Sequence, residues 1–249
     1  MTIILENQDA ANAFADPYLA DLANRGYAMT NYHGVTHPSQ PNYIALVSGS
    51  RHGVFLDMNW NVDDSSIADP IEAAGLTWKS YQESWPGNCF SGQSSGTYHR
   101  KHNPFISFNN IRNDPARCAN IVDASKLAAD AAAGQLPNYI FYTPDINHDG
   151  HNTGLAAASQ WLQGFLEPLL ADPAFADTLF HITFDEAANY FAPNKIYTVL
   201  LGQGILGAGK TDDVEYNHYS FLATLEQIFG LPSLGQNDAS ATLIPLQCN

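Results

Sequence analysis

The chain has 249 residues, of which 45% are hydrophobic and 14% charged, a composition that suits one large folded domain and argues against disorder. Its 25 acidic residues outnumber its 10 basic residues and give a net charge of −15, so its surface would repel a nucleic-acid backbone or an anionic bilayer. No apolar run approaches the roughly 20 residues that a membrane-spanning helix needs. We therefore expect no nucleic-acid partner and no membrane span, while composition leaves the oligomeric state open.

Strand-like and helix-like segments alternate along most of the chain. In chain order we expect a strand at 2–5, a helix at 18–25, a strand at 27–32, helices at 41–48 and 67–74, a strand at 78–82, a helix at 124–133, a strand at 139–142, a helix at 155–170, strands at 179–184 and 197–201, and a helix at 219–229. Asp16 and Pro17 mark the start of the first helix, and Gly26 marks its end. This alternation is typical of an α/β fold with a mostly parallel sheet covered by helices, and we find no linker that would divide residues 1–249 into two domains.

Residues 84–117 are rich in Gly, Ser, Asn, Pro and His and show no clear period, so we expect a long loop excursion on the surface. Cys89 and Cys118 either form a disulfide that closes this loop or stay as buried thiols, and we carry the disulfide forward as a prediction. Cys248 has no assigned partner. Few lysines and many Asn, Ser and Tyr residues fit a secreted or periplasmic protein, whose signal peptide would have been removed before Met1.

Carboxylates and one imidazole follow three of the predicted strands. They are Glu6 with Asn7 after 2–5, then Asp145, Asp149 and His151 after 139–142, and Asp185 with Glu186 after 179–184. Because ligands of open α/β sheets bind outside the carboxyl ends of the strands, we expect these side chains to gather at one edge. Clustered carboxylates repel one another unless a cation lies among them, and such oxygen ligands suit Mg, Ca or Mn, whereas imidazole favours Zn or Fe. Any one pair could be a solvated loop acid or a helix cap, so it is the set of three strand ends that indicates a metal site.

Ser39 directly precedes the predicted helix 41–48, which has Pro41 in its first turn and Gly49 at its end. The free backbone N–H groups and the positive dipole end of a helix N-terminus suit a phosphate group. Taken alone, a serine in this position is more often a plain N-cap. Beside a metal held by the carboxylates, its hydroxyl would instead be a nucleophile.

A series of motifs resembles the phosphoesterase family of bacterial acid phosphatases and phospholipases C, in the alkaline-phosphatase-like superfamily. The matching segments are Leu5-Glu6-Asn7, His37-Pro38-Ser39-Gln40-Pro41-Asn42-Tyr43, Lys101-His102-Asn103-Pro104-Phe105, Asp149-Gly150-His151-Asn152, Thr183-Phe184-Asp185-Glu186 and Asn217-His218-Tyr219-Ser220. They follow the family order over nearly the whole chain. The resemblance implies a three-layer α/β/α sandwich with a mostly parallel central sheet. One departure is Asn152, where family members often carry an aspartate that could orient His151 or serve a second metal.

The resemblance also implies a role for each motif residue. One divalent metal ion (Ca, Mg, Mn, Zn or Fe) is expected to be held by Glu6, Asn7, Asp185 and Glu186, with Ser39 as the nucleophile beside it. His102 and His151 are expected to act in catalysis as cations, and together with Asn42 to hold the phosphate oxygens. Asp149 and His218 are further candidates for substrate binding.

The activity that this resemblance implies is hydrolysis of small phosphomonoesters at acidic pH through a phosphoserine intermediate. A phospholipase C-type phosphodiesterase shares the motifs and is the alternative, with Tyr43, Trp85 and Tyr98 as aromatic residues that could surround a choline headgroup. A serine esterase would place its G-x-S-x-G motif between a strand and a helix. The matching string at 92–96 lies in the long loop, which argues against this function. A remote alternative is a non-enzymatic binding module in which the carboxylates hold a structural cation.

Overall fold

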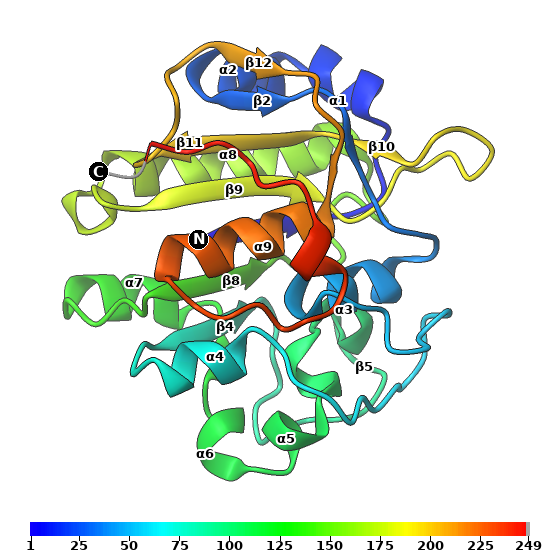
Figure 1. The fold of residues 1–249 in the computed structure, drawn as a ribbon, viewed down its shortest axis with the longest axis vertical. Coiled ribbons are helices and arrows are strands. Elements are labelled where there is room, and N and C mark those ends of the chain that lie inside the picture. Colours follow the sequence, from blue (N-terminus) through cyan, green and yellow to red (C-terminus); the bar gives the residue numbers. More distant parts are fainter. Residues whose placement is uncertain (248–249) are drawn as a thin grey trace.

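The computed structural model describes residues 1–247 and is built on an eight-stranded sheet (Figure 1). In spatial order the strands are β12 (Lys210–Asp212), β2 (Tyr27–Met29), β11 (Thr198–Gly202), β9 (Leu179–Phe184), β1 (Thr2–Leu5), β8 (Tyr139–Thr143), β4 (Trp78–Gln82) and β7 (Ile121–Asp123). Strand β11 runs antiparallel to both of its neighbours, and the other pairings in this sheet are parallel. The sheet is therefore mostly parallel, as the alternating pattern predicts.

Strand β1 lies in the middle of the sheet, between β9 and β8. Its four residues are all buried, as expected for a parallel strand that is covered on both faces. Leu5 pairs with Phe184 at the end of β9, and Ile3 pairs with Tyr142 near the end of β8. This register brings the residues that follow the three strands to the same edge of the sheet.

Helices cover both faces of the sheet. Helix α9 (His218–Phe229) crosses in front of the strands in Figure 1, whereas α8 (Leu155–Ala171) lies behind them, which gives the three-layer arrangement. Helix α9 packs against α3 (Ser39–Ser48), and α8 packs against α2 (Pro17–Arg25). The other helices are α1 (Ala10–Ala15), α4 (Ala68–Ala73), α5 (Asn109–Arg112), α6 (Pro115–Cys118) and α7 (Lys126–Ala132).

Local signals in the sequence explain where several of these helices begin and end. The side chain of Asp16 accepts hydrogen bonds from the backbone N–H groups of Tyr18 and Leu19 and so caps α2. Gly49 and Gly230 follow α3 and α9 with φ of 70° and 63°, the left-handed conformation that only glycine adopts without strain. These boundaries agree with the sequence prediction to within about two residues.

The predicted strand at 27–32 consists of two strands in different sheets. Strand β2 ends at Met29, and β3 (Tyr32–His33) forms a small sheet with β10 (Lys195–Ile196) and β13 (Tyr216–Asn217). The chain leaves the main sheet at Thr30, whose backbone N–H and hydroxyl both donate to the carbonyl of Asp212. The sequence prediction also missed α1, β7 and β12, which are too short to show a hydrophobic period.

The segment 84–117 is more ordered than its composition predicts. It contains β5 (Ser94–Ser95), β6 (Tyr98–His99), α5, most of α6 and two 3-10 turns, η1 (Arg100–His102) and η2 (Phe105–Ser107). Several of its aromatic side chains, among them Phe105 and Phe108, are fully buried, so the segment is part of the core and not a plain surface loop. The predicted disulfide between Cys89 and Cys118 is present and links the start of the segment to α6. Cys248 lies outside the described residues.

A buried apolar cluster extends from Ile3 in β1 to Ile244 near the end of the described chain. Its continuity is the basis for our interpretation of the chain as one domain. Within residues 1–247, no helix combines the length and the apolar character needed to cross a bilayer.

Candidate active site

Helix α3 presents Ser39 beside the carboxyl ends of β1 and β9. Ser39 is the first residue of the helix and is only 1% exposed, and the residues that follow it to Ser48 are also buried. The first backbone N–H groups of a helix have no partner within the helix, and they form its positive dipole end. The start of α3 therefore provides an environment that favours a bound anion.

The hydroxyl of Ser39 lies among side chains from the ends of these two strands. Ser39 Oγ is 2.9 Å from Glu6 Oε2, 3.2 Å from Glu186 Oε1 and 3.3 Å from Asn7 Oδ1. Asp185 joins the group, because its Oδ1 accepts a hydrogen bond of 3.0 Å from the backbone N–H of Asn7. The structure thus brings Ser39 together with all four residues of the predicted metal set.

Asn7 is held in an unusual conformation at the centre of this cluster. Its φ is 49°, in the left-handed region that residues other than glycine seldom adopt. Its side-chain oxygen faces three other oxygens, at 3.1 Å from Asp185 Oδ1, 3.2 Å from Glu6 Oε2 and 3.3 Å from Ser39 Oγ. Either a turned amide that donates N–H groups or a cation held by the amide oxygen would make this arrangement favourable. Three carboxylates, an amide oxygen and a hydroxyl are a donor set that fits a divalent metal ion.

The charges of the buried carboxylates also fit a cation. Burial, and then the charges of Glu6 and Glu186, raise the pKa of Asp185 well above its ordinary value. Burial and the charge of Glu6 raise the pKa of Glu186 in the same way. Burial also acts to raise the pKa of Glu6. The neighbouring His102 and Lys101 outweigh this effect, so the pKa of Glu6 is lowered. Because Glu6 Oε1 is buried and has no hydrogen-bond partner, a positive charge at this point would satisfy it.

His102 connects the Ser39 cluster with the end of β8. Its Nε2 lies 3.3 Å from Glu6 Oε2, its Nδ1 lies 3.3 Å from Asp149 Oδ2, and its ring stacks on Tyr43. Burial lowers the pKa of His102, although Glu6 acts in the opposite direction. Burial and the charge of Glu6 raise the pKa of Asp149, whose Oδ1 accepts a hydrogen bond from the backbone N–H of His151. The two predicted residues His102 and Asp149 therefore do belong to this cluster.

His151 lies at the exposed rim of the cluster. Its Nδ1 is 2.7 Å from Asn152 Oδ1, and its Nε2 is 3.1 Å from Lys101 Nζ. Because an ammonium group can only donate, Nε2 is the acceptor, and the ring hydrogen is assigned to Nδ1, which donates to Asn152. In this arrangement the ring joins Lys101 to Asn152. Asn152 orients the ring even though it is not the aspartate that is common in the resembling family.

The side chain of Asn42, which the sequence predicts to bind phosphate, forms hydrogen bonds with the backbone instead. Its Oδ1 accepts hydrogen bonds from the backbone N–H groups of Val35 at 2.8 Å and Thr36 at 3.0 Å. Its amide nitrogen donates to the carbonyls of Thr36 at 2.8 Å and Pro38 at 3.1 Å. Both amide hydrogens are used, so Asn42 has no donor left for a phosphate and instead holds the loop that leads into Ser39.

His218, the first residue of α9, supports the site from behind. It is fully buried, and its Nε2 lies 2.7 Å from the backbone oxygen of Asp185. Burial lowers the pKa of His218 to about 4, so the ring is neutral and Nε2 donates its hydrogen to that carbonyl. This geometry indicates that His218 orients Asp185, in place of the predicted contact with substrate.

Other residues at the site were given no catalytic role from the sequence. His37, expected at most to support the Ser39 loop, contacts Glu186 through Nδ1, and Tyr190 stacks on His37 and donates to Glu186 Oε1 at 3.3 Å. Lys101 contacts Asp57, with 3.2 Å between Nζ and Oδ2. His37 and Lys101 are the first residues of two of the family motifs, so their positions in these motifs could have identified them as site residues. Asp57 and Tyr190 come from loops that show no pattern.

A second group of possible metal ligands lies after β4 and β8. Ligand atoms of Glu83, Asp145 and His148 all lie within 4.8 Å of one another, a grouping that could hold a metal ion. His148 Nδ1 is 2.6 Å from Glu83 Oε2, and Asp145 Oδ2 accepts hydrogen bonds from the hydroxyls of Ser84 and Thr97. Asp145 thus belongs to this group and not to the Ser39 cluster, in which the strand-end pattern had placed it.

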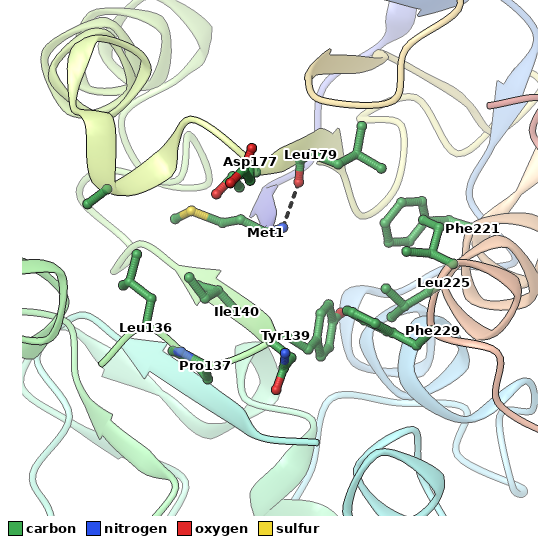
Figure 2. A pocket seen from close by; sticks show the side chains of 14 residues that line it. Met1, Leu136, Pro137, Tyr139, Ile140, Asp177, Leu179, Phe221, Leu225 and Phe229 are labelled. Atoms are coloured by element: carbon green, nitrogen blue, oxygen red, sulfur yellow. Dashed lines mark hydrogen bonds between the residues drawn. The ribbon is translucent and has the colours of Figure 1, made fainter. Parts of the chain in front are cut away.

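Figure 2 shows a pocket that lies at the other edge of the sheet. It has a volume of about 320 Å³, and apolar side chains such as Met1, Phe221 and Leu225 line much of it. Tyr139 and Leu179, which also line it, are the first residues of β8 and β9. The pocket is therefore at the amino ends of the strands, away from Ser39. The charged cluster at the carboxyl ends is the better candidate for the site of chemistry, because it unites a serine hydroxyl at a helix N-terminus with buried titratable groups.

Known proteins of similar sequence include two fungal acid phosphatases. The chain is 40% identical to a probable acid phosphatase of Kluyveromyces lactis, over 99% of this chain and 62% of the relative. It is 38% identical to a phosphate-repressible acid phosphatase of Penicillium chrysogenum, again over 99% of this chain and 62% of the relative. It is 28% identical to a phosphatidylinositol-3-phosphatase of Mycobacterium tuberculosis, over 94% of this chain and 77% of the relative. The chain spans about three fifths of the length of the fungal relatives.

Solved structures share the fold. A protein in the alkaline phosphatase superfamily from Vibrio parahaemolyticus has a TM-score of 0.63 at 15% identity, over 96% of this chain and 69% of that protein. A phosphonate monoester hydrolase of Agrobacterium radiobacter has a TM-score of 0.62 at 12% identity, over 93% of this chain and 73% of that protein. The fold is therefore the alkaline-phosphatase-like fold that the motifs imply. Residues 12–232 match the model of the Phosphoesterase family, and with the fungal relatives this match shows that the chain belongs to that family.

Proposed function

We propose that the protein is a metal-dependent phosphomonoester hydrolase of the acid phosphatase type, with Ser39 as its nucleophile. The observation that carries the proposal is the position of Ser39 Oγ, at the start of α3 and within 3.3 Å of Glu6, Asn7 and Glu186. The acid phosphatase relatives support the reaction class. Secretion, which a disulfide favours, belongs to the same proposal.

In the first step Ser39 Oγ attacks phosphorus, so that an Oγ–P bond forms while the ester P–O bond breaks and the alcohol departs. The hydroxyl of Ser39 donates to Glu6 Oε2 before the attack. The proton that the attack releases passes to the oxygen of the departing alcohol, which leaves as a neutral molecule. In the second step water attacks the phosphoserine, the Oγ–P bond breaks, and inorganic phosphate leaves. One hydrogen of this water passes to Ser39 Oγ and restores the hydroxyl, and the phosphate keeps the other.

The residues that would hold the metal are Glu6, Asn7, Asp185 and Glu186. A divalent ion bound there would supply positive charge to the phosphate oxygens and lower the pKa of the Ser39 hydroxyl. The protein contributes the rest by positioning. Asn42 fixes the loop before Ser39, and the positive end of α3 favours the anionic substrate.

His102 is placed to act on the phosphate and the leaving group from the side of β8. Its ring lies between Glu6 and Asp149 and stacks on Tyr43. His151 lies further out, at the rim, where a departing alcohol would need a proton. We assign both histidines to the catalytic site on this basis.

The phospholipase C-type alternative is less well supported by the aromatic residues. Tyr43 and Tyr98 are at most 2% exposed and Trp85 is 8% exposed, and Trp85 packs edge-on against Tyr98. They are core residues, so they do not form an open cage for a choline headgroup. The site therefore fits a small monoester better than a choline diester.

A side-by-side assay of p-nitrophenyl phosphate and p-nitrophenyl phosphorylcholine tests the proposal, with and without a chelator. We expect turnover of the monoester at acidic pH, loss of turnover on chelation, and loss of turnover in Ser39→Ala. Ser48→Ala is a matched control, because Ser48 is a buried serine at the other end of the same helix, where its hydroxyl contacts Ile44, Ser50 and His52. Activity that survives chelation, or a strong preference for the choline diester, would overturn the proposal.

A further inference from the structure

We propose that Lys101 binds a non-bridging oxygen of the substrate phosphate and makes the site select monoesters over diesters, an inference that rests on the proposed phosphatase function. Lys101 lies in η1, one residue before His102. Its side chain is 16% exposed, so it is largely withdrawn from solvent. Lys101 Nζ lies 3.1 Å from His151 Nε2, which places it next to a residue of the proposed catalytic site.

Asp57 holds this lysine against the nucleophile helix. Asp57 Oδ2 is 3.2 Å from Lys101 Nζ, and Asp57 Oδ1 accepts a hydrogen bond of 2.9 Å from the backbone N–H of Gln40. The side chain of Gln40 accepts a hydrogen bond of 2.8 Å from the backbone N–H of Met58. One carboxylate thus connects the ammonium group to the residue that follows Ser39, so the position of Lys101 is tied to that of the nucleophile.

The charge of Lys101 acts on the cluster as a whole. Burial acts to raise the pKa values of Glu6 and Asp149, and the positive charge of Lys101 opposes this effect at both, although the pKa of Asp149 stays raised. The neighbouring Arg100 does not contribute in this way, because its guanidinium donates to the carbonyls of Ser91 and Trp60 on the far side of the turn. Lys101 is therefore the basic residue of η1 whose charge is directed toward Ser39.

Lys101 can respond to the difference in charge between a monoester and a diester. In the arrangement of hydrogen bonds described above, the His151 ring accepts from Lys101 and donates to Asn152, which keeps the ammonium group at the rim. A phosphomonoester dianion has one negative charge more than a diester. At a pH above about 6, where the monoester is a dianion, a fixed ammonium group at the rim gains more from it than from a diester, because Coulomb attraction grows with the charge. A lysine that only neutralised Asp57 would stabilise the fold without affecting this choice.

The test compares Lys101→Met with the wild-type protein on p-nitrophenyl phosphate and bis(p-nitrophenyl) phosphate. We expect kcat/KM for the monoester to fall by about tenfold or more and kcat/KM for the diester to change much less. The inhibition constant for inorganic phosphate should rise by a similar factor. Lys101→Arg keeps the charge and should retain the ratio of monoester to diester activity. Asp57→Asn releases the lysine and should lower that ratio by a smaller factor.

Lys79→Met is the matched control, because Lys79 forms an ion pair with Asp130 away from the site, with 2.6 Å between Nζ and Oδ2. It should leave both the activity ratio and the phosphate affinity unchanged. Equal losses on both substrates in Lys101→Met, or an unchanged affinity for phosphate, would overturn the role of Lys101. Binding of inorganic phosphate, measured by calorimetry, requires no turnover. A wild-type protein without monoesterase activity would therefore refute the proposed function. Calorimetry of Lys101→Met and Lys79→Met would still decide whether Lys101 binds phosphate.

Discussion

Replacement of Asn42 by alanine tests the correction that the structure makes to the role of this residue. The change removes four hydrogen bonds and leaves the partly buried backbone N–H groups of Val35 and Thr36 without their acceptor. At about 0.5–1.5 kcal/mol for each bond, the sum is about 2–6 kcal/mol, and we expect a loss of about 3 kcal/mol in the free energy of unfolding. Turnover should fall as well, because the loop that ends at Pro38 sets the position of Ser39.

Urea denaturation followed by tryptophan fluorescence measures this loss. Asn103→Ala is a suitable control, since Asn103 is also buried but makes one side-chain hydrogen bond, of 3.2 Å to Tyr98. We expect that control to lose about 1 kcal/mol. If Asn42→Ala kept its stability and lost only its affinity for phosphate, Asn42 would be a direct phosphate ligand and the reasoning from its hydrogen bonds would be refuted.

Two other predictions follow from the buried carboxylates. Asp185→Asn should lower both the metal content and the turnover, because it removes a charged ligand from the cluster. Elemental analysis measures the metal content, and a full metal content in an inactive variant would contradict this prediction. Glu226 is away from the site, and burial, with the charge of Asp238, raises its pKa from 4.5 to about 7. The folded state therefore binds this proton more tightly than the unfolded state, so the carboxyl group destabilises the fold increasingly as the pH rises from about 4.5 to about 7. Glu226→Gln should be more stable than the wild type by about 1–3 kcal/mol at pH 8 and equally stable at pH 4, whereas parallel stability curves for the two proteins would contradict the raised pKa.

Much of the fold could be predicted because its strands and helices carry strong local signals. The buried run of β1 and the Asp16–Pro17 and Gly49 boundaries all express preferences that act within a few residues. Strand β11 illustrates the limit. Its apolar residues predict a strand, but its direction depends on where the chain returns after the loop that precedes it.

The site residues that follow strand ends or belong to motifs could be predicted from the sequence. The role of a residue could not be predicted where several groups compete for its hydrogen bonds. The sequence identifies Ser39 and the carboxylates correctly as neighbours. It could not show that the backbone occupies the whole amide of Asn42. Nor could it show that Asp145 turns toward Glu83, because adjacent loops decide which way a side chain after a strand points.

The most direct test of the central claim is to trap the covalent intermediate. Metal-loaded protein is quenched in acid during turnover of p-nitrophenyl phosphate, and its peptides are mapped by mass spectrometry. The account predicts a phosphoryl group on Ser39 in the wild-type protein and in Ser48→Ala, with neither a phosphopeptide nor turnover in Ser39→Ala. A phosphoryl group on a different residue, or turnover near the wild-type rate in Ser39→Ala, would contradict the account.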